Sequence, residues 1–311
     1  MGNGSATSND SRDFLRLCDR SAADLDELIQ RAAHLHAAFA ARTPPRTLAG
    51  RRVGFIWDAE GFRNRAAFEL GVQLLAGHGV SIPGRLGERE AVDDLARYLD
   101  NWFDAVVIRT PSFHTLSQFA AAAHAPVINA RTRHNHPCEI LGDLAFVHAV
   151  RGSLQDLRVV FVGEASNLCH SWCEAAAVLP IHLTQVRPPG FGVQPAWLAS
   201  LTPTPAGQVD QTHDLAAAIG HAEVIYTDCW PSSADHEQYQ QIRSLFGPLQ
   251  ITAEVLAGAP ADALFLPCPP VTRGQEVSVD AMQAPKCRVY QAKQWLLHAQ
   301  NALLEQTLTE D

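Results

Sequence analysis

Short apolar runs alternate along this chain with longer segments in which apolar residues recur at helical spacing. The strands expected from the runs are residues 53–57, 77–82, 104–108, 125–129, 157–162, 181–186, 223–227 and 263–266. The helices expected from the periodic segments are about residues 21–40, 63–76, 91–102, 113–123, 140–150, 168–179, 214–220, 237–246 and 291–303. Continuous apolar strands that alternate with helices are typical of a parallel sheet covered on both faces, so the pattern predicts an α/β fold.

The alternation restarts after residues 152–154, which separate two halves of similar pattern. A chain of 311 residues is long for one core and sufficient for two domains. We therefore expect two doubly wound parallel-sheet domains joined by interdomain helices. The first is residues 1–150, completed by a C-terminal helix at 290–311, and the second is residues 151–289.

Charge and cysteine content narrow the class of protein. The formal net charge is −9, which argues against nucleic acid as a partner. No run of about 18 apolar residues occurs, so no membrane span is expected. Residues 1–12 are rich in Gly, Ser and Asn and predict a tail, not a signal peptide. The seven scattered cysteines favour a reducing, cytoplasmic location, and they lack the close CxxC spacing of a structural zinc site.

The basic residues are almost all arginines, with Lys286 and Lys293 the two lysines of the sequence. Base composition of the genome is the simplest explanation. The chemical consequence is that an anion site here must use arginine forks, main-chain amides and histidine.

Polar side chains collect where the expected strands end. The first half contributes Arg63, Arg65, Arg109, Thr110, His136 and Glu139, and the second contributes Asn167, Asp228, Ser232, Cys268 and Arg273. Taken singly, a strand-end arginine is most often solvated, a lone histidine is most often structural, and a lone cysteine is a small buried hydrophobe. Their shared position is the stronger signal, because doubly wound sheets bind ligands beyond the carboxyl ends of their strands.

Two expected helix starts bear on phosphate binding. The helix that begins near Arg63 offers free amides and a positive dipole end, which suit a phosphate or carboxylate. The turn at Gly163 lacks the second and third glycines of GxGxxG, so a dinucleotide site is only weakly indicated.

The order and spacing of these segments resemble the aspartate/ornithine carbamoyltransferase family, and the ornithine branch most closely. The resemblance rests on residues 55–69, 86–90, 107–110, 126–129, 136–143, 162–171, 226–232, 268–277 and 297–300, and so covers nearly the whole chain. It implies an enzyme that transfers a carbamoyl group from carbamoyl phosphate to an amine, without a metal or organic cofactor.

The resemblance also implies roles for the donor half of the site. Arg63 and Arg109 would hold the phosphate, and His136 with Thr110 would hold the carbamoyl oxygen. Asn64, Arg65 and Glu139 would complete this half. Oriented donors at the developing charge and arginines at the leaving phosphate are the expected source of catalysis.

The acceptor half is implied in the same way. Asn167, Asp228 and Ser232 would hold the α-amino and α-carboxyl groups of an ornithine-like amino acid. Cys268 would lie near Asp228 and orient the attacking amine, with Arg273 also at the catalytic site. The family's trimeric assembly makes a homotrimer the expected state, and Arg85 the residue most suited to reach a neighbouring subunit.

The departures from the family pattern are concentrated in the donor half. The family's Ser-Thr-Arg-Thr-Arg loop is Gly61-Phe62-Arg63-Asn64-Arg65 here, with Asp58 and Glu60 beside it. Each lost hydrogen bond to a charged group costs about 1.5–3 kcal/mol, so we expect weakened binding of carbamoyl phosphate. The glutamine that follows His-Pro-Cys in the family is Glu139, whose carboxylate accepts from an NH2 group but repels an anion unless protonated.

Smaller departures lie elsewhere. The family's His-Cys-Leu-Pro is Pro267-Cys268-Pro269-Pro270, its Ser-Met-Gly is Ser232-Ser233-Ala234, and Arg85 stands where ornithine enzymes tend to have glutamine. The residues expected to hold the amino acid are largely intact.

Three interpretations follow. The first is a carbamoyltransferase-like enzyme with an altered donor or acceptor, serving specialised metabolism. The second is an inactive relative that binds an amino acid or acts as an assembly partner. The third is different chemistry at an amino-acid amine, such as a lyase or ligase step with Glu139 as the acid or base.

Overall fold

The computed structural model describes residues 12–202 and 205–309 and divides the chain into two compact units. Within these residues, unit 1 extends to Arg133 and resumes at Leu297, and unit 2 extends from His134 to Leu296. Apart from Arg12, the expected tail at residues 1–12 lies outside the described residues.

Unit 1 is built on a four-stranded sheet with the order β2-β1-β3-β4. Its strands are β1 (Arg52–Trp57), β2 (His78–Ile82), β3 (Ala105–Arg109) and β4 (Val127–Arg131), and all their pairings are parallel. β3 is buried along its whole length because it is an inner strand covered on both faces, which explains its continuous apolar sequence.

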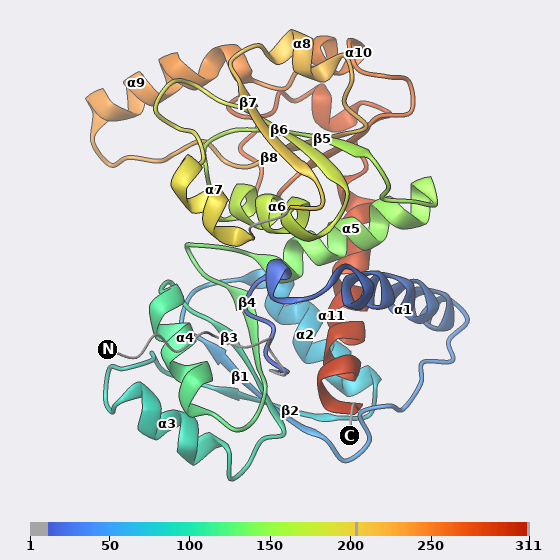
Figure 1. The fold of residues 1–311 in the computed structure, drawn as a ribbon, viewed down its shortest axis with the longest axis vertical. Coiled ribbons are helices and arrows are strands. Elements are labelled where there is room, and N and C mark those ends of the chain that lie inside the picture. The colour runs from blue at the N-terminus through green and yellow to red at the C-terminus, as the bar shows by residue number, and fades with distance from the viewer. Residues whose placement is uncertain (1–11, 203–204, 310–311) are drawn as a thin grey trace. The chain divides into compact units, whose positions relative to one another are not determined.

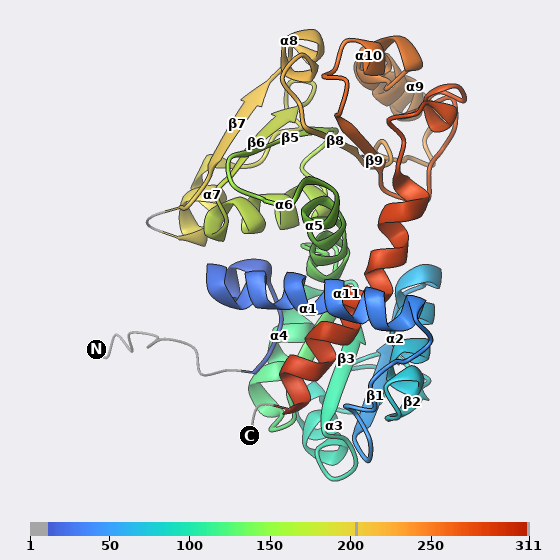
Figure 2. The same ribbon diagram turned by 90° about the vertical axis from the view of Figure 1, so that its right-hand side faces the viewer.

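Helices cover both faces of this sheet (Figures 1 and 2). They are α1 (Ala22–Ala40), α2 (Phe62–Leu74), α3 (Val92–Leu99), α4 (Phe113–Ala122) and the C-terminal part of α11 (Val289–Thr309). Helices α3 and α4 pack on the face that carries Ile56 and Ile108. Helix α2 packs on the opposite face, where the rings of Phe68 and Phe55 lie 6.4 Å apart.

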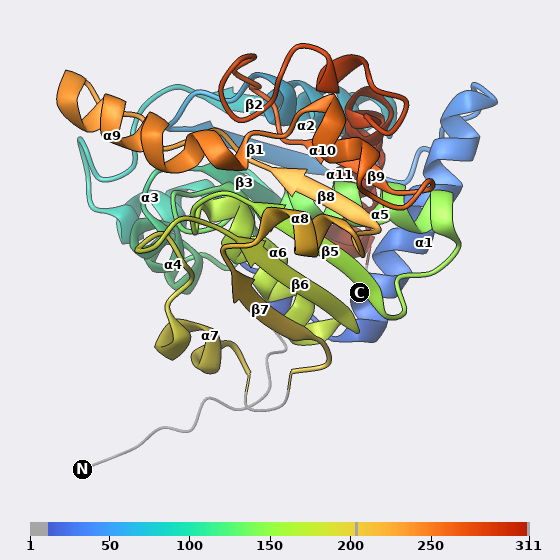
Figure 3. The same cartoon turned by 90° about the horizontal axis from the view of Figure 1, so that it is seen from above.

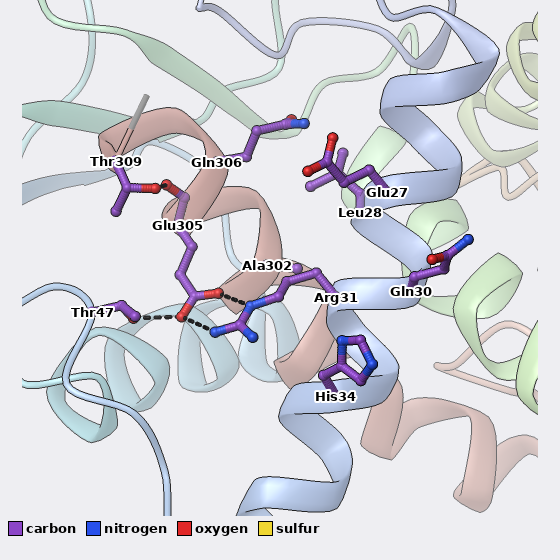
Figure 4. Close-up of a pocket in the computed structure, with 10 residues that line it drawn as sticks. All are labelled: Glu27, Leu28, Gln30, Arg31, His34, Thr47, Ala302, Glu305, Gln306 and Thr309. Carbon is purple, nitrogen blue, oxygen red and sulfur yellow. Dashed lines mark hydrogen bonds and ion pairs between the residues drawn. The ribbon is translucent and has the colours of Figure 1, made fainter. Parts of the chain in front are cut away.

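A partly buried ion pair ties α1 to α11 (Figure 4). The guanidinium of Arg31 donates to both oxygens of Glu305, at 2.6 and 3.0 Å, and the hydroxyl of Thr47 donates to the same carboxylate. These residues line a pocket of about 520 Å³. Because Arg31 and Glu305, which line this pocket, are paired with each other, their presence there has a structural explanation.

Unit 2 contains a five-stranded parallel sheet with the order β7-β6-β5-β8-β9, seen from above in Figure 3. Its strands are β5 (Leu157–Val162), β6 (Ile181–Val186), β7 (Gln208–Thr212), β8 (Val224–Thr227) and β9 (Leu264–Pro267). The order places later strands on both sides of β5, as in a doubly wound sheet.

The helices of unit 2 also lie on both faces of its sheet. They are α5 (Pro137–Arg151), α6 (Asn167–Val178), α7 (Pro195–Leu201), α8 (Leu215–Ile219), α9 (His236–Phe246) and α10 (Ala253–Ala257), with the first part of α11. Helices α8 and α10 cover the face that carries Val160 and Phe265. On the other face, the α6 residue Trp172 packs edge-on against Tyr226, with ring centroids 5.5 Å apart.

The structure confirms the predicted class, since both units are parallel α/β sheets with helices on both faces. Among the described α-helices and strands, α7, β7 and α10 are absent from the expectation. The helix expected at 91–102 ends at Leu99, where the Asn101 side chain donates to the carbonyls of Arg97 and Tyr98. The terminal helix continues to Thr309, beyond the expected end at 303.

The units defined by packing meet at residues 133 and 134, before α5. The functional domain boundary expected at 150 and 151 falls after α5 and stays a prediction. Among the described residues, we find no helix with the length and apolar content needed to cross a membrane.

Candidate functional site

Each sheet has one place where the chain reverses direction across it, between β1 and β3 in unit 1 and between β5 and β8 in unit 2. Doubly wound sheets bind ligands beyond the strand ends at this switch point. The loop before α2 and residues Arg109 and Thr110 follow β1 and β3. Asn167 and Asp228 follow β5 and β8. Of the sequence-predicted residues, Arg109, Thr110, Asn167 and Asp228 therefore lie at the switch points of their sheets.

In unit 1, Arg109 lies against the N-terminus of α2. Gly61 is the N-cap of this helix and provides no side-chain cap. A Cβ atom at position 61 would collide with the Arg109 guanidinium, whose Nη1 would lie 2.6 Å away. A largely buried arginine over an uncapped helix N-terminus combines a positive side chain with free amides, which is a favourable setting for an anion.

Besides Gly61, the loop has two further changed hydroxyl positions, which differ in their surroundings. Phe62 is 88% exposed at the first position of α2, so in this chain its ring does not fill the interior of the loop. Asn64 is buried, and both polar atoms of its side chain make no hydrogen bond to the described residues. A buried amide without a protein partner is typical of a group that contacts a ligand or an ordered water. Arg63, between them, is exposed.

Two further residues of the predicted donor half have partners within unit 1. Arg65 donates to Glu69 at 2.8 Å, and Trp57 donates to the same carboxylate at 3.0 Å. The Thr110 hydroxyl donates to Asp58 at 2.7 Å. The expected negative charge of Asp58 is therefore used within the protein, and it occupies the hydroxyl assigned to the carbamoyl oxygen.

Arg85 lies in the exposed loop between β2 and α3. The loop covers a pocket of about 480 Å³ above Ile56 and Ile82, at the ends of β1 and β2. Because the loop lies at the edge of unit 1, the Arg85 side chain is exposed to solvent in the single chain.

In unit 2, His136 is the N-cap of α5, and Pro137 takes the first helical position. Proline is favoured there because its missing N–H would have no helical partner. The main-chain amide of His136 donates to the Ser171 hydroxyl at 2.8 Å, which fixes the start of the helix. The imidazole Nε2 lies 3.6 Å from the Glu139 carboxylate one turn later.

Glu139 is paired with a lysine that the sequence-based prediction of the site did not include. The Nζ of Lys293, on α11, lies 2.7 Å from Glu139 Oε1 and 2.8 Å from each oxygen of Asp143. Tyr226 also donates to Asp143, at 2.8 Å. Burial disfavours the charged ammonium, but Asp143 and Glu139 outweigh burial and raise the pKa of Lys293. The one distinguishing signal in the sequence was the rarity of lysine.

The predicted acceptor residues lie at the end of the unit 2 sheet. Asn167 is buried at the start of α6, whereas Ser232 is exposed in the loop after β8. Asp228 accepts from the amide of Cys229 at 2.8 Å. Burial raises the pKa of the Glu164 and Glu276 carboxyls, and the charge of Asp228 raises both further. These two acids, absent from the predicted site, make this region suited to a cationic group.

Cys268, directly after β9, lies near enough to both Glu139 and Asp228 for their charges to act on it. Burial raises the pKa of its thiol, and the neighbouring charges of Glu139 and Asp228 raise it further. The side chain therefore stays a thiol and cannot serve as a ready thiolate nucleophile. Arg273, also predicted, is exposed in the loop after β9.

Within residues 12–202 and 205–309, no group of three or more His, Cys, Asp or Glu side chains is arranged to hold a metal ion. Arginine, histidine and carboxylate side chains and the helix amides supply hydrogen bonds and charge at the predicted residues. Such groups can stabilise a developing oxyanion and a leaving phosphate.

Comparison with known proteins identifies the two halves. Residues 12–149 match the carbamoyl-P binding domain of aspartate/ornithine carbamoyltransferase, and residues 155–307 match its Asp/Orn binding domain. Both matches agree with the resemblance seen in the motifs.

Individual relatives share the full length of the chain. Ornithine carbamoyltransferase of Chlorobaculum tepidum is 34% identical, covering 100% of this chain and 92% of its own. The Methylococcus capsulatus protein of that name is 33% identical, covering 96% and 99%. Among solved structures, ornithine carbamoyltransferase from Pyrococcus furiosus has a TM-score of 0.90 at 27% identity, covering 98% and 100%. That from Gloeobacter violaceus has 0.83 at 30%, covering 96% and 98%. The chain belongs to the aspartate/ornithine carbamoyltransferase family, whose members are transferases.

Proposed function

We propose that this protein transfers a carbamoyl or related acyl group from an acyl phosphate to the amine of an ornithine-like amino acid. The observation that carries the proposal is the placement of the Arg109 guanidinium over Gly61 at the N-terminus of α2. This arrangement is suited to a phosphate group even though the family's loop hydroxyls are missing.

The proposed reaction divides between the halves. Arg63, Arg109 and the α2 amides neutralise the phosphate as it leaves, with the Asn64 amide as a further contact. His136 stabilises the negative charge that develops on the transferred carbonyl oxygen. Asn167, Asp228 and Ser232 hold the amino acid, and Cys268 orients its attacking amine.

The proposal includes an altered donor or acceptor that serves specialised metabolism. Support comes from the exposed ring of Phe62 beside Arg63, which offers a planar or apolar contact next to the phosphate site. The free state of all seven cysteines supports a reducing, cytoplasmic setting.

We also propose a homotrimer in which Arg85 reaches a neighbouring subunit. Exposed apolar side chains on α2 and β2, namely Phe62, Leu70 and Val80, support contact of these elements with a neighbouring subunit. Light scattering of the purified protein should give three times the mass of 33.8 kDa, and a monomer would refute this part of the proposal.

An inactive relative is the second candidate, favoured by one observation. Thr110 and Arg65 are held by Asp58 and Glu69 instead of being left for a ligand. Such a protein would keep the amino-acid half and lose the donor half.

A ligand titration separates the two candidates. Carbamoyl phosphate and L-ornithine are added separately while the melting temperature is followed, because a ligand that binds the folded state raises it. The transferase proposal predicts stabilisation by carbamoyl phosphate or another acyl phosphate, and by ornithine or a related diamino acid. Stabilisation by the amino acid alone, with no phosphate release from any acyl phosphate, favours the inactive relative.

Phe62→Thr is the accompanying variant. It restores a family hydroxyl at an exposed position without crowding Arg109. If the lost hydroxyl weakens carbamoyl phosphate binding, this variant should bind it about tenfold more tightly. Unchanged affinity would show that position 62 has no part in the donor site.

A further inference from the structure

Two acidic residues on one face of α5 share a single ammonium. Glu139 and Asp143 are four residues apart, and their side chains are 6% and 1% exposed. Lys293 lies within 2.8 Å of both and is itself 11% exposed. Two buried carboxylates at this spacing repel each other strongly unless a counter-ion lies between them, and Lys293 takes that position.

Each partner of Lys293 has a different second contact. Asp143 accepts from the hydroxyl of Tyr226, so it is held within the core of unit 2. Glu139 has its other oxygen, Oε2, 3.6 Å from Nε2 of His136. Lys293 holds Oε1 of Glu139 and thereby fixes the direction of Oε2. Asp143 is thus held by Tyr226, whereas Glu139 lies beside His136, the residue proposed to stabilise the carbonyl oxygen.

A glutamate held in this way differs chemically from the glutamine of the family pattern. An ionised carboxylate accepts hydrogen bonds and donates none, while a glutamine amide does both. A group that contacts Glu139 must therefore present an N–H or O–H. The ammonium of Lys293 offsets the negative charge that would otherwise repel an anionic donor.

We propose that Lys293 is a positioning residue that keeps Glu139 ionised and aimed beside His136, and that this pair selects donors bearing an N–H group. The inference rests on the proposed transferase function. It distinguishes carbamoyl phosphate, which has an NH2 group, from acetyl phosphate, which has a methyl group in its place.

The test uses Lys293→Met, Glu139→Gln, the double variant and the wild-type protein. Lys286→Met is the matched control, since Lys286 donates to the carbonyls of Leu256 and Ala259, away from the cluster. Affinity for carbamoyl phosphate and for acetyl phosphate is measured by titration at neutral pH.

Lys293→Met should bind carbamoyl phosphate at least about tenfold more weakly, because an uncompensated carboxylate then faces the donor. Adding Glu139→Gln should restore the affinity. Glu139→Gln alone should reduce the preference for carbamoyl over acetyl phosphate by about tenfold or more.

Normal affinity in Lys293→Met, or no rescue in the double variant, would overturn the inference. If Lys293→Met fails to fold, the donor preference of Glu139→Gln decides, and an unchanged preference would overturn the inference.

If wild-type protein binds neither acyl phosphate, the transferase proposal fails separately. In that case, the melting temperatures of the variants without ligand test the pairing of Lys293 with Glu139. A higher melting temperature in the double variant than in Lys293→Met supports the positioning role of Lys293. Equal melting temperatures for the double variant and Lys293→Met overturn it.

Discussion

The guanidinium of Arg109 lies in the space that a side chain on residue 61 would occupy. The glycine at this position, where the family has serine, therefore does more than remove a hydroxyl. It lets the arginine approach the N-terminus of α2, where the free amides and the side chain can act on the same anion. In the proposed donor site, the absence of a side chain at position 61 makes room for Arg109.

Gly61→Ala should weaken phosphate binding while leaving the fold intact. The added methyl group would displace the guanidinium, which is the flexible end of its side chain. Loss of one hydrogen bond to a charged group predicts a dissociation constant for carbamoyl phosphate that is at least about tenfold larger. Inorganic phosphate, measured by titration calorimetry, serves as a second probe.

Gly247→Ala is the control for that substitution. Gly247 ends α9 with a φ of −48°, and a Cβ there would meet nothing within 4 Å. Equal phosphate affinity in both variants would mean that the contact between Gly61 and Arg109 has no influence on the donor site.

The supersecondary pattern was predictable because it depends on local periodicity. The strands β1, β3, β5 and β8 are apolar runs, since inner strands of a covered sheet are buried on both faces. β7 was missed because it is an edge strand with the sequence Gln-Val-Asp-Gln-Thr, which shows no apolar run. α10 was missed because five residues are too few to display a helical period.

The site was predictable in outline and not in its contacts. Strand ends show where Arg109, His136 and Asp228 emerge, since topology brings strand ends to one edge. The pairing of Glu139 with Lys293 joins residues more than 150 positions apart, and no spacing in the sequence indicates it. The approach of Arg109 to Gly61 likewise depends on a side-chain rotamer in the folded chain.

Cys268 should resist thiol reagents in the folded protein. Burial raises the pKa of its thiol, and only the thiolate reacts rapidly. Alkylation followed by mass spectrometry should label the partly exposed Cys18 and Cys287 well before Cys268. Faster labelling of Cys268 than of these two would show an activated thiol and contradict its proposed role in orienting the amine.

Arg31→Met should destabilise unit 1. The change leaves the buried Glu305 carboxylate with the Thr47 hydroxyl but without its ion-pair partner (Figure 4). Since Arg31 is itself partly exposed, we expect a loss of about 2 kcal/mol in the free energy of unfolding. Denaturant titration measures this loss. In the double variant with Glu305→Gln the loss should shrink, and an undiminished loss would show that Arg31 acts through packing alone.

Acid should destabilise the protein partly through His298. Burial lowers the pKa of this residue to about 4, and the neighbouring His36 contributes further. The rings of His36 and Phe39 each lie 5.1 Å from it. Because the unfolded chain takes up this proton near about pH 6.5, the contribution to stability is complete above that pH and is lost as pH falls toward 4.

His298→Gln should therefore show a smaller loss of melting temperature between neutral and mildly acidic pH than wild-type protein. Glutamine keeps a polar side chain of similar length and does not titrate. Parallel pH profiles for the two proteins would place the acid sensitivity in other groups.

Phosphate release from carbamoyl phosphate is the most direct test of the central claim, measured with a series of α,ω-diamino acids that includes L-ornithine. The account predicts release that depends on one of these amines, yields a ureido product in equal amount, and falls by at least about a hundredfold in Arg109→Met. Amine-independent release, or equal rates in wild-type protein and Arg109→Met, would contradict it.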